Sequence, residues 1–126
     1  MKKALLYNKT KNKVILENLY YADGIGDRLM GLIPFKELKE DEGMFLPDCS
    51  CIHTFFMSFP IDCFFLNKDY RVESVRKNIS PFRVASGKNI FRGHVLEIAS
   101  LGDRNVLLDR GDRLEIRFKT AGQSLD

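Results

Sequence analysis

Apolar residues in this chain occur in short runs separated by polar turns, a pattern typical of β-strands. Clusters of Asn, Asp, Gly, Ser and Pro separate the runs at intervals of roughly ten residues. Strands at this spacing, with little room for helices between them, predict a mainly β, single-domain fold. We expect an antiparallel β-sandwich or closed barrel of the jelly-roll kind, with one short helix. The expected strands are 3–7, 13–20, 43–46, 52–57, 63–66, 70–77, 95–99 and 113–118.

Two apolar runs, Ile52–Met57 and Cys63–Leu66, stand on either side of Phe59 and Pro60. Each run has the length of a strand and is too continuously apolar for a strand with one face in water. We therefore expect them to be two interior strands joined by a proline corner.

The expected helix lies within residues 23–33, where Asp23 or Asp27 would cap its start. Leu29, Leu32 and Ile33 would form its buried side, and Gly31 would allow close approach to a strand. The glycines at 24 and 26 do not complete a dinucleotide-binding pattern, because Leu29 occupies the third glycine position. We therefore expect no nucleotide site here.

Size and composition indicate one domain spanning residues 1–126, with 119–126 as a frayed tail. The net charge of +3 arises from 20 basic and 17 acidic residues, a mixture that a solvated surface explains without a nucleic-acid partner. No apolar run approaches the ~20 residues of a membrane span, and the N-terminal run is too short for a secretory signal. The odd count of three Cys favours reduced thiols, and hence a cytoplasmic protein.

Cys49, Cys51 and His53 alternate, so on a strand they would share one face at steps of about 7 Å. With Cys63 alongside, they make a possible zinc ligand set. An extended strand wraps an ion poorly, however, and unpaired Cys is often simply a buried residue. We favour that structural role and expect no cofactor, with Cys49 as the one candidate nucleophile.

Asp62 and Glu97 each interrupt an apolar run, and a charge in a buried strand needs a partner. Arg28, His53 and Arg83 are the partners that the sequence offers, and our hypothesis is that Arg28 pairs with Asp62 or Glu97. These groups are either a catalytic acid/base pair, Asp62 with Glu97 or His53, or an ion cluster that holds the fold together. We favour the cluster, because structural ion networks are common.

The chain resembles the domain-of-unknown-function family numbered 192. The resemblance rests on the run from Pro47 to Leu66, with Cys49, Ile52–Met57, Phe59–Asp62 and Phe65–Leu66, and on five shorter matches: Arg28–Leu32, Gly43–Met44, Pro81–Arg83, Leu96–Glu97 and Gly111–Asp112. Three places depart from the family pattern: Ser58 replaces a basic residue, Cys63 replaces a Val-like residue, and Ala99–Gly102 replaces a shorter turn.

The resemblance implies a compact, mainly β, jelly-roll-like domain and no particular reaction. It marks Arg28, His53, Asp62, Arg83 and Glu97 as a shared polar site or a shared structural cluster. We therefore expect a non-enzymatic module that binds a small ligand or a protein. The alternatives are a small hydrolase-like enzyme that uses Asp62 with Glu97 or His53, and a thiol or zinc site at Cys49, Cys51 and His53.

Overall fold

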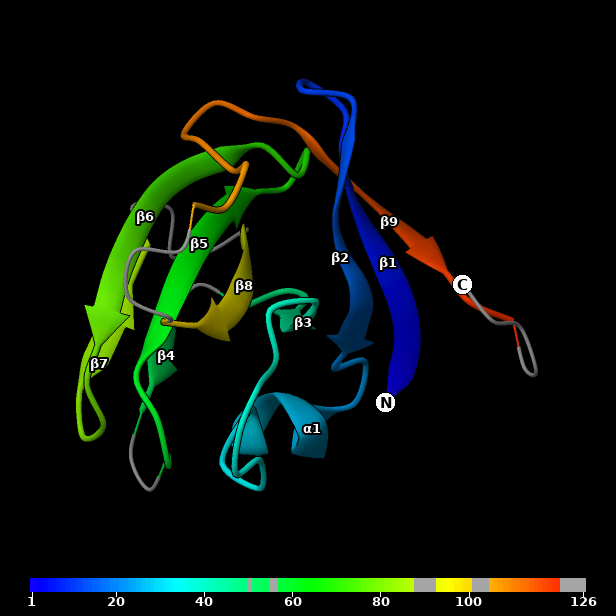
Figure 1. Cartoon of the computed structure of the whole chain (residues 1–126). Helices are drawn as coiled ribbons and strands as arrows, with labels where there is room; N and C mark the ends of the chain where they lie inside the picture. The colour runs from blue at the N-terminus through cyan, green and yellow to red at the C-terminus, as the bar shows by residue number, and fades with distance from the viewer. Residues whose placement is uncertain (50, 55–56, 88–92, 101–104, 121–126) are drawn as a thin grey trace.

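The computed structural model describes residues 1–49, 51–54, 57–87, 93–100 and 105–120. Within them the chain forms one short helix and nine strands (Figure 1). In chain order these are β1 (Lys2–Asn8), β2 (Lys13–Tyr21), α1 (Ile25–Met30), β3 (Glu42–Leu46), β4 (Cys51–His53), β5 (Ile61–Asn67), β6 (Val72–Ile79), β7 (Val84–Ser86), β8 (Gly93–Ala99) and β9 (Leu114–Phe118).

Seven strands form one mixed sheet in the order β6-β5-β8-β3-β2-β1-β9, and β4 pairs with β7 in a separate two-stranded sheet. Every neighbouring pair is antiparallel except β2 and β3, which run parallel. The fold is therefore mainly β with one small helix, as predicted, but its main sheet is mixed and is not a closed barrel. The parallel pair arises because the chain leaves β2, passes through α1 and returns beside β2 in the same direction.

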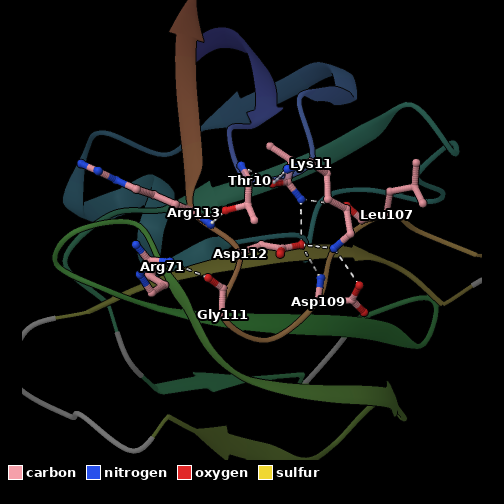
Figure 2. A network of polar contacts seen from close by, with 9 residues as sticks. Thr10, Lys11, Arg71, Leu107, Asp109, Gly111, Asp112 and Arg113 are labelled. Atoms are coloured by element: carbon pink, nitrogen blue, oxygen red, sulfur yellow. Dashed lines mark hydrogen bonds and ion pairs between the residues drawn. The ribbon is translucent and has the colours of Figure 1, made fainter.

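The two edges of the large sheet meet where the chain enters β6 and β9. An isolated bridge joins Arg71, just before β6, to Arg113, just before β9, and the Val72 amide donates to the Asp112 carbonyl at 2.8 Å. Side chains fasten this junction, as Figure 2 shows: Lys11 pairs with Asp109 and Asp112, and the Arg71 guanidinium donates to the Gly111 carbonyl at 2.7 Å.

Buried side chains cover both faces of the central strands. One cluster contains Met44, Cys63, Phe65 and Val95, and the other contains Phe45, Phe64, Leu96 and Ile98. Adjacent residues of β3, β5 and β8 thus alternate between the two clusters, as the pleat requires. This arrangement confirms that Cys63–Leu66 is interior strand, because β5 pairs with β6 on one side and β8 on the other.

Within the described residues the upstream apolar run is not an interior strand of the main sheet and does not pair with β5, which corrects our expectation. Of the upstream run, β4 extends only to His53 and pairs with β7, which the sequence pattern did not predict; Phe55 and Phe56 lie outside the described residues. The cause is Thr54, which is fully buried. Its hydroxyl donates to the Ser80 carbonyl at 2.7 Å and accepts from the Arg83 amide at 2.8 Å, so this segment is tied to the loop before β7.

Helix α1 begins and ends differently from our expectation. Gly24 precedes it in an extended conformation, and no side chain caps it. Leu29 is 69% exposed, whereas Leu32, beyond the helix, is buried. Gly31 ends the helix at φ +52°, a conformation that side-chain-bearing residues adopt with strain. It also lies close to a strand, as expected, because a Cβ there would be 3.7 Å from Glu97 Oε1 of β8.

A candidate binding cavity beneath helix α1

A cavity of about 250 Å³ lies between α1 with the turn that follows it, the segment leading into β4, and strand β8. Its walls are mainly apolar, with side chains of Leu32, Leu46, Ile52 and Met57 contributing. Its polar lining consists of Arg28, Asp48, Cys49, Cys51, His53 and Glu97. A concave apolar space with a few polar groups is the usual form of a small-molecule site.

Glu97 is the buried polar group of this cavity. It is 3% exposed and lies on β8 directly opposite Met44 of β3 and Cys63 of β5. Burial raises its pKa from 4.5 to about 8, so the carboxyl is protonated at neutral pH. Among the described residues, no ion pair or side-chain hydrogen bond reaches this carboxyl.

Asp62 does not share this cavity. It lies opposite Ile98, one position along from the Cys63–Glu97 pair, and therefore projects from the other face of the sheet. Its carboxylate accepts the backbone N–H of Asn78 at 2.8 Å. The structure thus does not bring Asp62 and Glu97 together as an acid/base pair, whereas His53 and Glu97 do line the same cavity.

Arg28 and Arg83 occupy different places. Arg28 stands in the last turn of α1 and lines the cavity, but within the described residues it forms no ion pair within 4.0 Å with Asp62, Glu97 or any other acid. The expected pairing of Arg28 with a buried carboxylate is therefore not formed. Arg83 lies outside the cavity, and its guanidinium donates to the neighbouring Phe82 carbonyl at 3.3 Å.

The three cysteines differ in their exposure to solvent. Cys51 is exposed on β4, Cys49 is half-buried in the preceding turn, and Cys63 is buried within the sheet. The Cys49 thiol donates to the Cys51 carbonyl at 3.2 Å, and burial raises the pKa of both Cys49 and Cys63. A raised pKa keeps these sulfurs as thiols, the less reactive form. Among the described residues, no three His, Cys, Asp or Glu side chains gather in a way that could hold a metal ion.

Sequence reasoning missed two residues: Asp48, which lines the cavity, and His94, which bonds to the Asp48 backbone. Asp48 follows β3 at φ +52°, and its amide donates to His94 Nδ1 at 3.0 Å. His94 stacks on Phe45 and meets Tyr70 edge-on, and burial lowers its pKa. The sequence Pro47–Asp48 is typical of a turn, but the position of Asp48 at the cavity depends on tertiary structure.

The comparisons with known proteins agree on the family and the fold. The model of the DUF192 family, described as "Uncharacterized ACR", matches residues 6–116. The chain belongs to the DUF192 family. This membership confirms the resemblance drawn from the sequence motifs, and it assigns no reaction to the cavity.

Two solved structures share the DUF192 chain's fold. A protein from Sinorhizobium meliloti 1021, described as a "putative transcription regulator", aligns with TM-score 0.71 at 20% identity over 91% of this chain and 92% of its own. A protein of unknown function from Novosphingobium aromaticivorans DSM 12444 aligns with TM-score 0.70 at 23% identity over 90% and 83%. No curated protein matches the chain. No helix in the described part of the chain is long and apolar enough to cross a bilayer.

Proposed function

We propose that this DUF192 protein is a non-enzymatic binding module that takes a small, largely apolar ligand into the cavity beneath α1. One observation carries the proposal: Glu97, 3% exposed, lines this cavity and has no hydrogen-bond or ion-pair partner for its carboxyl among the described residues. Burial of an unpaired carboxyl costs free energy, and a ligand that supplies a partner would recover it.

The apolar walls support a ligand rather than a reaction. Leu32, Ile52 and Met57 are buried and line the same cavity with hydrocarbon, which favours desolvated binding of an apolar body. The nearby thiols of Cys49 and Cys63 are held protonated by burial, which is unfavourable for nucleophilic catalysis. The three free cysteines also suit a reducing compartment, and we propose the cytoplasm as the place of action.

A fragment screen by ligand-observed NMR tests the proposal, with wild type, Glu97→Leu and Asp62→Asn compared side by side. Asp62→Asn is the matched control, because it changes a carboxylate on the opposite face of the same sheet. We expect fragments that bind wild type and Asp62→Asn and lose binding to Glu97→Leu, which removes the polar group from the cavity. Fragments that bind all three proteins equally, or no bound fragment at all, would contradict a site at Glu97.

A further inference from the structure

A carboxyl group and a guanidinium group line the cavity without pairing with each other. The Glu97 carboxyl is buried in β8, and the Arg28 guanidinium extends from α1. No ion pair within 4.0 Å joins them, and neither side chain has another charged partner in the described residues. Burial is the main cause that raises the pKa of the half-buried Cys49 thiol, and Glu97 adds to the rise while Arg28 opposes it.

Resting on the proposed binding function, we infer that the cavity takes a free aliphatic amino acid. Its ammonium group pairs with the Glu97 carboxylate, and its carboxylate pairs with the Arg28 guanidinium. Its hydrocarbon side chain lies against the apolar wall formed by Leu32, Ile52 and Met57.

A zwitterionic ligand fits this site better than a ligand that carries only a positive or only a negative charge. A simple carboxylate would satisfy Arg28 but would leave the buried Glu97 unpaired. A simple amine would satisfy Glu97 and leave the Arg28 guanidinium without an anion. Arg is suited to the carboxylate end, because its planar fork binds carboxylates through two parallel hydrogen bonds.

The volume limits the ligand to small members of this class. An apolar cavity of roughly 150 Å³ holds a benzene molecule. The cavity here measures about 250 Å³ and so has room for a ligand somewhat larger, of the size of leucine.

Binding of the ammonium group requires Glu97 to lose its proton to solvent. The other charged or titratable groups around the carboxyl are Arg28 on α1, Asp48 and Cys49 before β4, Cys51 and His53 on β4, and Cys63 on β5. Asp48 is exposed to water, and burial keeps the thiols of Cys49 and Cys63 protonated. The inference assigns the released proton to Glu97, the buried acid of this set.

Isothermal titration calorimetry of the full chain tests this with four matched probes: L-leucine, 3-methylbutylamine, 4-methylpentanoate and 3-methylbutanol. The second lacks the carboxylate, the third lacks the ammonium group, and the fourth carries neither charge. We expect leucine to bind at least about tenfold more tightly than each of the others. Glu97→Gln should weaken leucine and 3-methylbutylamine alike, whereas Arg28→Gln should weaken leucine and leave 3-methylbutylamine unchanged. Asp62→Asn should leave all four unchanged.

The pH dependence of the wild type gives a readout that needs no variant. Below the pKa of Glu97, about 8, the dissociation constant for leucine should rise about tenfold for each unit of falling pH. Titrations at pH 7 in buffers of different ionisation enthalpy should show about one proton released per leucine bound.

The outcomes separate the inference from the proposed function. If leucine binds no better than 3-methylbutanol, or if its binding releases no proton, the amino-acid inference is overturned and a cavity for neutral ligands stands. If 3-methylbutylamine matches leucine and Arg28→Gln has no effect, the zwitterionic ligand is likewise overturned. If none of the four probes binds and the fragment screen is also empty, the proposed function fails with it.

Discussion

Cys63 and Glu97 lie directly opposite each other on the neighbouring antiparallel strands β5 and β8. Both side chains are buried, and burial raises the pKa of each above its ordinary value. At neutral pH the pair is therefore a thiol beside a carboxylic acid, with no charge on either group. The interior of the sheet accommodates two ionisable side chains here because neither is ionised.

The buried Glu97 makes stability depend on pH. The carboxyl ionises near 4.5 in the unfolded chain and near 8 in the folded protein. Between these values the native state holds a proton that the unfolded state has lost, so the free energy of unfolding falls as pH rises, by roughly 1.4 kcal/mol per pH unit. The stability that the protonated Glu97 contributes to the folded state is fully present below pH 4.5 and is lost above about pH 8.

We predict that Glu97→Gln removes this slope. Urea denaturation of both proteins at pH 5, 6, 7 and 8 measures the difference between their free energies of unfolding. Buried His94 contributes a change of its own below pH 6.5, but it is common to both proteins and cancels in the difference. Parallel pH profiles for the two proteins would show that Glu97 ionises normally in the folded state.

Asp112 at the junction of the two sheet edges should be a strong contributor to stability. Burial alone would raise the pKa of this carboxyl, but hydrogen bonds from Lys11, the Asp109 amide and Asn8 outweigh it and lower the pKa below 3.8. We predict that Asp112→Asn lowers the free energy of unfolding by about 1–3 kcal/mol, since hydrogen bonds to a charged acceptor are weakened and one of their donors, Asn8, stays fully buried.

Asp109→Asn is the matched control for that change. Asp109 also pairs with Lys11, at 2.7 Å, but its side chain is 75% exposed, and an exposed pair contributes about 0–1 kcal/mol. Chemical denaturation at pH 7 compares the two variants. Equal losses of unfolding free energy in the two variants would refute the view that the buried Asp112 carboxylate, rather than the charge on Lys11, stabilises the junction.

Gly43 on β3 should tolerate no side chain. A Cβ built there would lie 2.6 Å from Leu16 Cδ1 and 3.1 Å from the Glu97 carbonyl oxygen. We predict that Gly43→Ala destabilises the protein by about 1–3 kcal/mol through overpacking. Gly26→Ala in α1 should leave stability unchanged or raise it by up to about 1 kcal/mol, because a Cβ there meets nothing within 4 Å and alanine favours helix. Thermal unfolding of both variants gives the comparison.

The three cysteines should react with iodoacetamide in the order Cys51, Cys49, Cys63. Cys51 is exposed, Cys49 is half-buried with a raised pKa, and Cys63 is 0% exposed with a pKa raised well above the ordinary value. Peptide mass spectrometry after timed alkylation measures the order. Cys63 should react only in urea, and its rapid alkylation in native protein would contradict the position of β5 inside the sheet.

Much of the fold is predictable from local pattern, because strand length and apolar content are local properties. The predicted strands 3–7, 13–20 and 95–99 appear as β1, β2 and β8 with small shifts at their ends. Strand partners are different, since they depend on contacts far along the chain. Thr54 shows this: its buried hydroxyl bonds to Ser80 and Arg83, and so it directs β4 toward β7 instead of β5.

The candidate site is harder to predict than the fold, because it depends on register. Arg28, His53 and Glu97 were predicted as site residues and do line one cavity. Asp62 lies outside the cavity because the register pairs Cys63, and not Asp62, with Glu97. A register shift of one residue would move Asp62 to the cavity face of the strand. The exposure of Leu29 could not be predicted from periodicity, because α1 is too short for an apolar face to be distinguished.

The parallel pairing of β2 with β3 also bears on how the family could diversify. Such strands cannot be joined by a hairpin, and the excursion between them, residues 23–40, supplies α1 and part of the cavity wall. This excursion makes none of the strand pairings of the sheet, so its sequence and length can change while every strand keeps its neighbours. Replacing residues 23–40 with other segments, while the strands stay the same, would thus be a direct route to new ligand selectivity.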